Sequence, residues 1–191
     1  MGLRKRLGQT AGFLLLALTL AACAAGPSRP AAPDRVSLSS LPQGASAVAM
    51  GDDAFSRATL DAINADRVAE GIPPLSPDTQ LQHAAAVHSA DMAVRKFIGH
   101  YNPDRQGPNE RMLAVWPEFK GSLAENIAAM NGPLAKKEGT RPEDLANALV
   151  KQWRASPPHR KNMRNAAFTI GGVGIAREGD TVYVTTLFAT P

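Results

Sequence analysis

The hydrophobic pattern of the chain changes near residue 168, and this change limits the fold class. Before it, apolar residues recur at helical spacing in segments bounded by Gly and Pro, such as residues 52–70, which end before Gly71. After it, residues 168–177 and 181–188 are rich in Val, Ile, Thr and Tyr, and a Glu-Gly-Asp loop joins them. Helices followed by a terminal hairpin predict an α+β domain.

Further helical segments are expected between the first helix and the hairpin. They are residues 76–98, 110–115, 124–130 and 140–153. Ser76-Pro77 supplies a capping hydroxyl and a first-turn proline, and Thr140-x-x-Glu143 is typical of a capping box. Ser156-Pro157-Pro158 is expected to end the last helix in a brief turn. Gly171-Gly172-x-Gly174 lies inside a predicted strand with no helix after it, which excludes a dinucleotide fingerprint.

The amino terminus has the plan of a secretory signal. Arg4, Lys5 and Arg6 precede an apolar run over residues 12–25, which is shorter than the ~20 residues that span a bilayer. Three of the 21 basic residues thus lie in residues 1–22, and the remainder holds 18 basic against 17 acidic residues. The near-neutral remainder has no basic stripe, so the sequence argues against nucleic acid as a partner.

The single cysteine of the chain follows this apolar run. Leu20-Ala21-Ala22-Cys23 resembles the bacterial lipobox, in which the cysteine is lipidated and becomes the first mature residue. The alternative is ordinary cleavage after an Ala-x-Ala match, which would release a secreted protein. We favour the lipoprotein, held at a membrane through acyl groups such as palmitate on Cys23. Ala24 in place of Asp favours the outer membrane, facing the periplasm, over the inner membrane.

Residues 23–51 are rich in Ala, Pro, Ser and Gly and show neither helical nor strand periodicity. Such a composition cannot bury enough apolar surface to offset the entropy of ordering it. The predicted organisation is a signal peptide over residues 1–22, a tether over 23–51 and a folded domain over 52–191. Because aromatic residues make up only 5% of the chain, the core of that domain must be mostly aliphatic.

Several motifs with polar residues follow one another along the predicted domain. They are Asn64-x-x-Arg67 with Gly71-Ile72-Pro73-Pro74-Leu75, His88-Ser89-x-Asp91-Met92, Phe97-x-x-His100, Ala124-Glu125-Asn126-Ile127, Trp153-x-x-Ser156-Pro-x-His159-x-x-Asn162 and Gly172-Val173-Gly174. In this order they resemble the CAP superfamily (SCP domain) of cysteine-rich secretory proteins, antigen 5 and plant pathogenesis-related proteins, and most of all its bacterial secreted branch. The resemblance covers about residues 55–190. It implies a three-layer α–β–α sandwich with a third strand, for which residues near His100–Tyr101 are one candidate.

The resemblance also implies a ligand cleft. His100 matches the first histidine of the family site, Glu125 its acidic residue and His159 its second histidine, and Asn126 and Ser156 lie in the same motifs. Some members bind a divalent metal through the histidine pair, so His100 and His159 are candidate ligands for an ion such as zinc. Ser156 stands where eukaryotic members have a second acidic residue. His83 and His88 are expected on helix faces.

Two classes of function follow from the resemblance. The favoured one is a binding module at the cell envelope that recognises a lipid, glycan or protein. The other is a hydrolase or peptidase in which His100 and His159 hold a metal with an activated water and Glu125 is the general base. A metal-free variant with Ser156 as nucleophile, His159 as base and Glu125 as orienter is disfavoured, because Ser156 already serves as a cap before Pro157. A structural or envelope-stress role without a working cleft is a third possibility.

Overall fold

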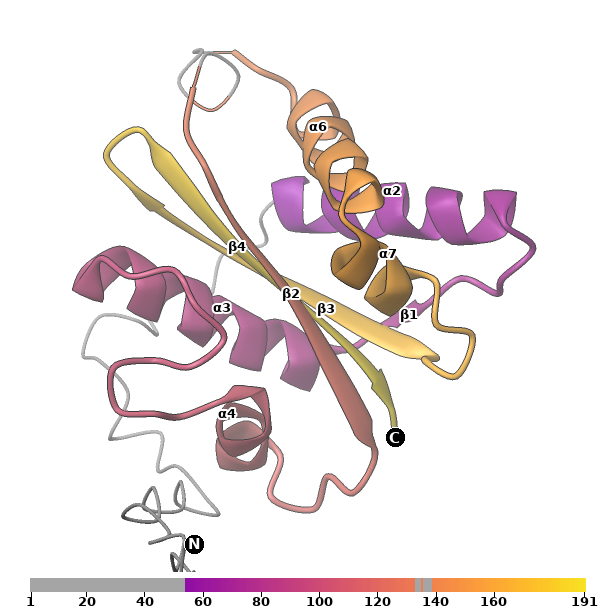
Figure 1. The fold of residues 1–191 in the computed structure, drawn as a ribbon, viewed down its shortest axis with the longest axis horizontal. Coiled ribbons are helices and arrows are strands. Elements are labelled where there is room, and N and C mark those ends of the chain that lie inside the picture. Colours follow the sequence, from indigo (N-terminus) through magenta and orange to yellow (C-terminus); the bar gives the residue numbers. More distant parts are fainter. Residues whose placement is uncertain (1–53, 133–134, 136–138) are drawn as a thin grey trace, which may run out of the picture. The chain divides into compact units, whose positions relative to one another are not determined.

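The computed structural model describes residues 54–132, 135 and 139–191, which all belong to one structural unit of the chain (Figure 1). The predicted signal peptide, Cys23 and the predicted tether lie outside the described residues, as do the first two residues of the predicted domain. In the part that is described, no helix has the length and hydrophobicity needed to cross a membrane.

A four-stranded mixed sheet forms the middle layer. Its strands, in the order β1-β3-β4-β2, are β1 (Ser76–Pro77), β3 (Ile170–Glu178), β4 (Thr181–Thr190) and β2 (Ser122–Met130). The long hairpin of β3 and β4 confirms the sequence prediction, with Glu178 opposite Thr181 at its turn. β2 pairs with β4 along its whole length and forms one edge of the sheet, while β1 adds a short parallel pairing to β3.

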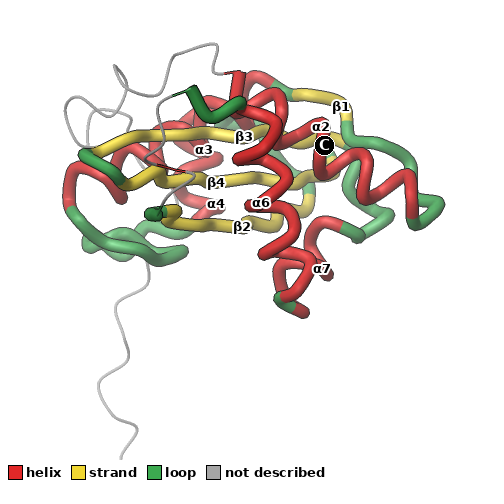
Figure 2. The backbone as a smooth tube through the Cα atoms, turned by 90° about the horizontal axis from the view of Figure 1, so that it is seen from above, coloured by secondary structure: helices red, strands yellow, loops and turns green. Residues whose placement is uncertain are grey.

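Helices cover both faces of this sheet, which gives the predicted three-layer α–β–α arrangement (Figures 1 and 2). On one face lie α3 (Thr79–Arg95) and α4 (Pro108–Val115). On the other lie α2 (Ala54–Ala69), α6 (Pro142–Ala155) and the short α7 (Pro157–Met163). The residues predicted to form a brief turn after Ser156 therefore form the first turn of α7.

The central strand β3 alternates between the two helical layers. Val173 and Ile175 join the core beneath α2 and α6, whereas Gly172 and Gly174 face α3. A Cβ atom at Gly174 would lie 1.9 Å from the backbone nitrogen of Ala86, so α3 contacts the strand with no room for a side chain between them. The glycine-rich segment thus serves close helix–sheet packing, as strand glycines often do.

Several local predictions are wrong. Residues 124–130 form strand β2 rather than a helix, and this strand, not the residues near His100, is the third long strand of the sheet. Helix α3 is capped by the Asp78 side chain, which accepts hydrogen bonds from the backbone of Gln80 and Leu81, so Ser76 is not the cap. Arg141 rather than Thr140 occupies the N-cap of α6, and its side chain makes no capping hydrogen bond.

Two motif residues fasten the connection between α2 and β1. Asn64 donates to the carbonyl of Leu75 at 3.0 Å and accepts from its backbone N–H at 2.8 Å. Arg67 is fully buried and donates to four carbonyl oxygens at 2.8–3.0 Å, which belong to Pro73, Met163, Asn165 and Phe168. Its guanidinium thereby joins the end of α2 to the segment that leads from α7 into β3, which keeps α7 beside the sheet edge.

Candidate functional site: a histidine pair at the edge of the sheet

Glu125 is the centre of the candidate site. It lies on β2 with its side chain only 2% exposed, and both carboxylate oxygens accept hydrogen bonds. Nδ1 of His100 donates to Oε1 at 2.9 Å, and Nη2 of Arg111 on α4 donates to Oε2 at 2.6 Å. Burial pushes the pKa of Glu125 up, but the hydrogen bond from His100 and the charge of Arg111 outweigh it and hold the pKa below its usual range.

The strand conformation of residues 122–130, found in place of the predicted helix, matters for Glu125. As part of a helix, Glu125 and Asn126 would lie about 100° apart around its axis, whereas on a strand they point to opposite faces of the sheet. Glu125 faces the layer of α3 and α4, where it meets His100 and Arg111. Asn126 faces α7, where its side-chain amide donates to the carbonyl of His159 at 3.1 Å. The edge strand therefore links the two candidate histidines.

The loop that carries His100 is held by buried polar groups. Arg111 donates to the carbonyl of His100 at 3.0 Å and to that of Gln106 at 2.8 Å. Asn102 accepts from the backbone of Gln106 at 2.9 Å and donates to the buried Asp91 at 3.2 Å. The His100 backbone is thus fixed, while its side chain remains 47% exposed. An ionised carboxylate only accepts, so the bond to Glu125 places the proton of a neutral His100 on Nδ1 and leaves Nε2 with a lone pair.

His88 lies behind this loop. Its Nε2 donates to the carbonyl of Gly99 at 2.9 Å, while its buried Nδ1 has no hydrogen-bond partner among the described residues. Burial and the charge of Arg111 lower the pKa of His88 to about 4, so the ring is neutral at pH 7. The helix-face position predicted for His88 is correct, and its hydrogen bond helps to place the residue that precedes His100.

His159 reaches the same region from α7. Its side chain is half-buried near Trp153, at 6.3 Å between ring centroids, and its buried Nδ1 meets no hydrogen-bond partner in the described part of the chain. Burial lowers the pKa of His159, and the charge of His100 lowers it further. Asn162 holds α7 against the strand by donating to the carbonyl of Glu125 at 3.1 Å and to Asn126 Oδ1 at 2.9 Å.

Ser156 lies at the junction of α6 and α7, where its backbone ends one helix and begins the next. Among the described hydrogen bonds none joins its hydroxyl to His159, and Glu125 bonds His100 instead of His159. The chain of contacts that a serine nucleophile requires is therefore not formed. The residues that the structure describes also contain no group of three or more His, Cys, Asp or Glu side chains placed to hold a metal ion.

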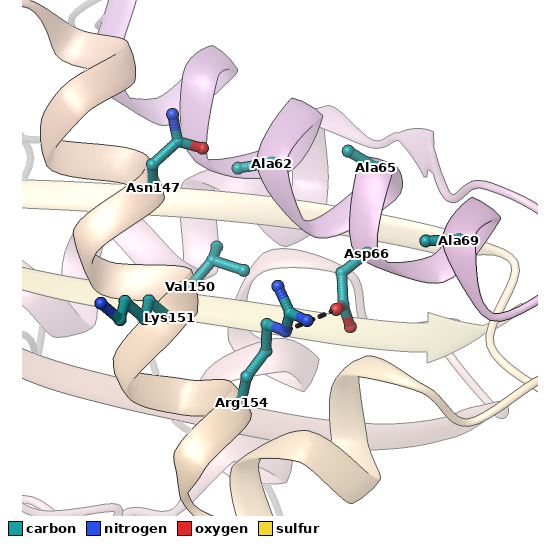
Figure 3. A pocket seen from close by; sticks show the side chains of 8 residues that line it. All are labelled: Ala62, Ala65, Asp66, Ala69, Asn147, Val150, Lys151 and Arg154. Carbon is teal, nitrogen blue, oxygen red and sulfur yellow. Dashed lines mark ion pairs between the residues drawn. The ribbon is translucent and has the colours of Figure 1, made fainter.

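A cavity of about 580 Å³ lies elsewhere, between α2 and α6 (Figure 3). Its lining consists of alanines, one valine and polar or charged side chains: Ala62, Ala65, Asp66, Ala69, Asn147, Val150, Lys151 and Arg154. Asp66 accepts from Arg164 at 2.9 Å and pairs with Arg154 at 2.9 Å, and these arginines lower the pKa of Asp66, with the Arg164 hydrogen bond as the largest cause. The described lining of this cavity includes none of the predicted site residues.

Arg111 is the site residue that the sequence interpretation missed. It is 2% exposed and binds both Glu125 and the His100 loop, yet it stands outside every motif singled out above. One signal was present: Arg111 follows Glu110 directly in a short helix whose next residue, Met112, is core. A charged residue on the buried side of a short helix needs a buried partner of opposite charge.

The fold and the histidine–carboxylate site define an α–β–α domain of the SCP type. The family model described as the cysteine-rich secretory protein family, CAP, matches residues 60–189. The chain belongs to this family, which confirms the resemblance.

Related proteins share the domain over part of their length. Protein YkwD of Bacillus subtilis (strain 168) is 32% identical over 126 residues, which are 66% of this chain and 44% of YkwD. An extracellular protein with an SCP domain from Bacillus anthracis str. Ames superposes with a TM-score of 0.58 at 26% identity, over 72% of this chain and 40% of its own. An outer surface protein of Borrelia burgdorferi shares the fold, with a TM-score of 0.62 at 17% identity over 74% and 96% of the two chains. The chain thus spans less than half of the first two proteins.

Proposed function

We propose that this protein is an envelope-anchored CAP-domain lipoprotein whose His100–Glu125–His159 site binds a ligand of the envelope, a lipid, a glycan or a protein. Support for an envelope location comes from the lipobox-like sequence at Cys23 and from the extracellular and surface placement of two structural relatives. The proposed ligand surface consists of the half-exposed His100 ring, the half-buried His159 ring and the partly exposed Ser156. The predicted cleft residue Asn126 is buried and supports the surface from beneath, through its hydrogen bond to the carbonyl of His159.

The hydrogen bonds and the lowered pKa of Glu125 favour a binding function over hydrolysis. A general base needs a pKa near the operating pH and a free lone pair facing the water that it activates. Glu125 is only 2% exposed, accepts a hydrogen bond on each oxygen and has a pKa below its usual range. Its role in this proposal is to orient His100 and keep the Nε2 lone pair free, as carboxylates do for histidine ligands.

A divalent metal such as zinc is part of the proposal only through the two histidines. Nε2 of His100 and the imidazole of His159 are nitrogen donors of the kind that zinc prefers, whereas the Glu125 oxygens are already engaged. With two protein ligands, a bound ion would keep open positions for a ligand of the envelope. Calorimetry with zinc tests this part: heat is expected from the wild type and from His83→Ala, and none from His100→Ala/His159→Ala. No heat from the wild type would reject the metal.

The anchor and the ligand are tested together by mass spectrometry of the protein extracted from membranes. Acyl groups on residue 23 are expected in the wild type and absent from Cys23→Ser, with labelled palmitate as the parallel assay. Under native conditions a retained mass is expected that His100→Ala/His159→Ala loses and His83→Ala keeps. An unacylated wild type contradicts the anchor, and equal retention by the double variant contradicts the binding site.

A further inference from the structure

Exposed apolar side chains gather at one end of α3. Among the described residues four large apolar side chains are strongly exposed, and three of them fall within residues 94–101: Val94 at 50%, Ile98 at 63% and Tyr101 at 59%. The fourth is Val68, near the end of α2. Single exposed apolar residues are normal, but a group of them marks an interaction surface. We call Val94, Ile98 and Tyr101 the α3-end patch.

The fold itself holds the patch outward. Lys96 adopts a left-handed conformation, with φ of 57°, that ends α3, and the backbone of Phe97 then donates to Met92 at 3.2 Å. The Phe97 ring turns inward against His88, at 5.9 Å between centroids, so the next residue, Ile98, faces solvent. The Tyr101 ring packs on Gly107, where an added Cβ would lie 2.8 Å from it. The contacts of Phe97 and Tyr101 thus fix the segment on either side of Ile98, whose side chain faces solvent.

Cationic side chains flank the same segment. Lys96 lies between Val94 and Ile98 in sequence and pairs with Glu178, and both side chains of that pair are about half exposed. Such an exposed pair contributes little to stability in water. Arg105 is exposed near the end of the same loop, next to the exposed Asp104, which pairs with Arg95. Aliphatic residues, a tyrosine and basic groups together are the composition with which proteins contact anionic bilayer surfaces.

We propose that the α3-end patch docks on the surface of the envelope bilayer and thereby turns His100 toward the lipid headgroups. Tyr101 follows His100 directly, so a bilayer that covers Tyr101 and Ile98 borders the candidate site. The inference rests on the lipid anchor of the proposed function. Residues 24–53 separate Cys23 from the first described residue and can extend at most ~100 Å, so an anchored domain stays within reach of the bilayer. Tethering makes a weak patch sufficient, because docking is then intramolecular.

The ligand class of the site follows from this orientation. A site that faces headgroups samples molecules that are embedded in the membrane or carry a lipid anchor themselves. Within the proposed function this favours a lipid, or a glycan or protein borne on one, over a freely diffusing solute.

The test uses the full mature chain coupled through Cys23 to a maleimide lipid in vesicles of phosphatidylethanolamine and phosphatidylglycerol. Since Cys23 is the only cysteine, coupling needs no other change and does not depend on acylation in the cell. Hydrogen exchange of the peptide over residues 94–101 is compared with that of the uncoupled chain without vesicles. We expect exchange to slow by at least about tenfold in wild type and Val68→Glu, and to remain fast in Ile98→Glu/Tyr101→Glu.

Each outcome decides the proposal. Equal exchange with and without vesicles overturns docking, and so does protection that survives in Ile98→Glu/Tyr101→Glu. Protection that rises with the surface density of protein, together with cross-linked dimers, assigns the patch to a second copy of the chain instead. The substituted side chains are more than half exposed, so only a small change in thermal unfolding is expected in all variants. The coupled chain can be protected even if mass spectrometry finds no acyl group on the cellular protein. That result would contradict lipidation of Cys23 and leave the docking of the α3-end patch on a bilayer supported.

Discussion

Arg111 and Glu125 form an ion pair from which water is excluded, with 2.6 Å between Nη2 and Oε2 and both side chains 2% exposed. The same guanidinium also donates to the carbonyls of His100 and Gln106. One side chain therefore joins helix α4, strand β2 and the loop that presents the first histidine. The geometry of the site depends on this pair, because His100 receives its backbone contact from Arg111 and its side-chain contact from Glu125.

Substitution of Arg111 tests this dependence. Arg111→Met leaves Glu125 as a buried charge without its arginine partner, which costs ~3–5 kcal/mol of unfolding free energy when one member of a buried pair is removed. The pKa of Glu125 should rise, since the burial that opposes ionisation is then less compensated. Urea unfolding at pH 7 measures the first effect, and carboxyl titration by NMR measures the second.

Two further variants control this experiment. Arg111→Met/Glu125→Gln removes both charges and should recover part of the lost stability, a coupling that the double-mutant cycle measures. Arg141→Met breaks an exposed pair with Asp144 and should change the unfolding midpoint little. If Arg111→Met unfolds at the wild-type urea concentration, the pair does not support the fold.

His88 should make stability depend on pH in mildly acidic solution. The folded protein keeps this ring neutral down to a pKa of about 4, whereas the unfolded chain takes up its proton near 6.5. A lowered histidine pKa means that the unfolded state binds more protons, so stability is full above about pH 6.5 and declines as the pH falls toward 4. The decline attributable to His88 is on the order of 3 kcal/mol. The lowered pKa of His159 acts in the same direction.

Unfolding by urea at a series of pH values between 7 and 4.5 checks this dependence. His88→Gln retains a group that can donate to the carbonyl of Gly99 and should flatten the pH dependence over this interval. The lowered pKa of Glu125 stabilises the fold above its unfolded value near 4.5, and most of that stabilisation is lost only at lower pH, so it affects the comparison little. A slope that stays unchanged in His88→Gln would assign the proton uptake to another group.

The sequence predicted the long helices and the terminal hairpin because their signals are local. Helical spacing and the glycine at position 71 bound the first helix, and a β-branched run marks the strands of the hairpin. The helix prediction for β2 was wrong for the opposite reason, because the segment's signal is not local. Its residues Ala124, Glu125, Ala128 and Met130 favour helices intrinsically, and only the nine-residue pairing with β4 makes the segment a strand. Pairing partners that lie some 60 residues away are not encoded in a local pattern.

The sequence indicated which residues belong to the candidate site, but not how they contact one another. Family resemblance identified His100, Glu125 and His159, while their spacing in sequence carried no information on contact. The structure adds that Glu125 and Asn126 serve opposite faces of one edge strand, and that Arg111 completes the carboxylate contacts. Neither relationship follows from a helix prediction for this segment, so the error in secondary structure concealed the organisation of the site.

Arg67 should be essential for stability without belonging to the site. Its buried guanidinium satisfies four carbonyl oxygens around the end of α2 and the start of β3. Arg67→Met leaves these acceptors without donors, and hydrogen bonds to charged groups contribute ~1.5–3 kcal/mol each, so a loss of at least about 3 kcal/mol is expected. Thermal and urea unfolding measure the effect. The exposed Lys151→Met serves as the control, and equal stability of the two variants would contradict this role.

The contact between α3 and β3 makes Gly174 intolerant of any side chain. In Gly174→Ala the added Cβ meets backbone atoms of Ala85 and Ala86 within 2.3 Å, and backbone cannot yield as a flexible side chain can. Helix and strand must separate, which costs ~1–3 kcal/mol or more for overpacking and also disturbs the bond from Ser89 Oγ to the carbonyl of Gly174.

Gly99→Ala is the matched control, because its Cβ would be 3.4 Å from the nearest atom, the Tyr101 carbonyl oxygen, and its carbonyl still accepts from His88. Urea unfolding should show a large loss for Gly174→Ala and little change for Gly99→Ala. Equal unfolding midpoints would mean that α3 can move away from the sheet at little cost, so that the helix which carries His88 and leads to His100 is not fixed by its packing on β3.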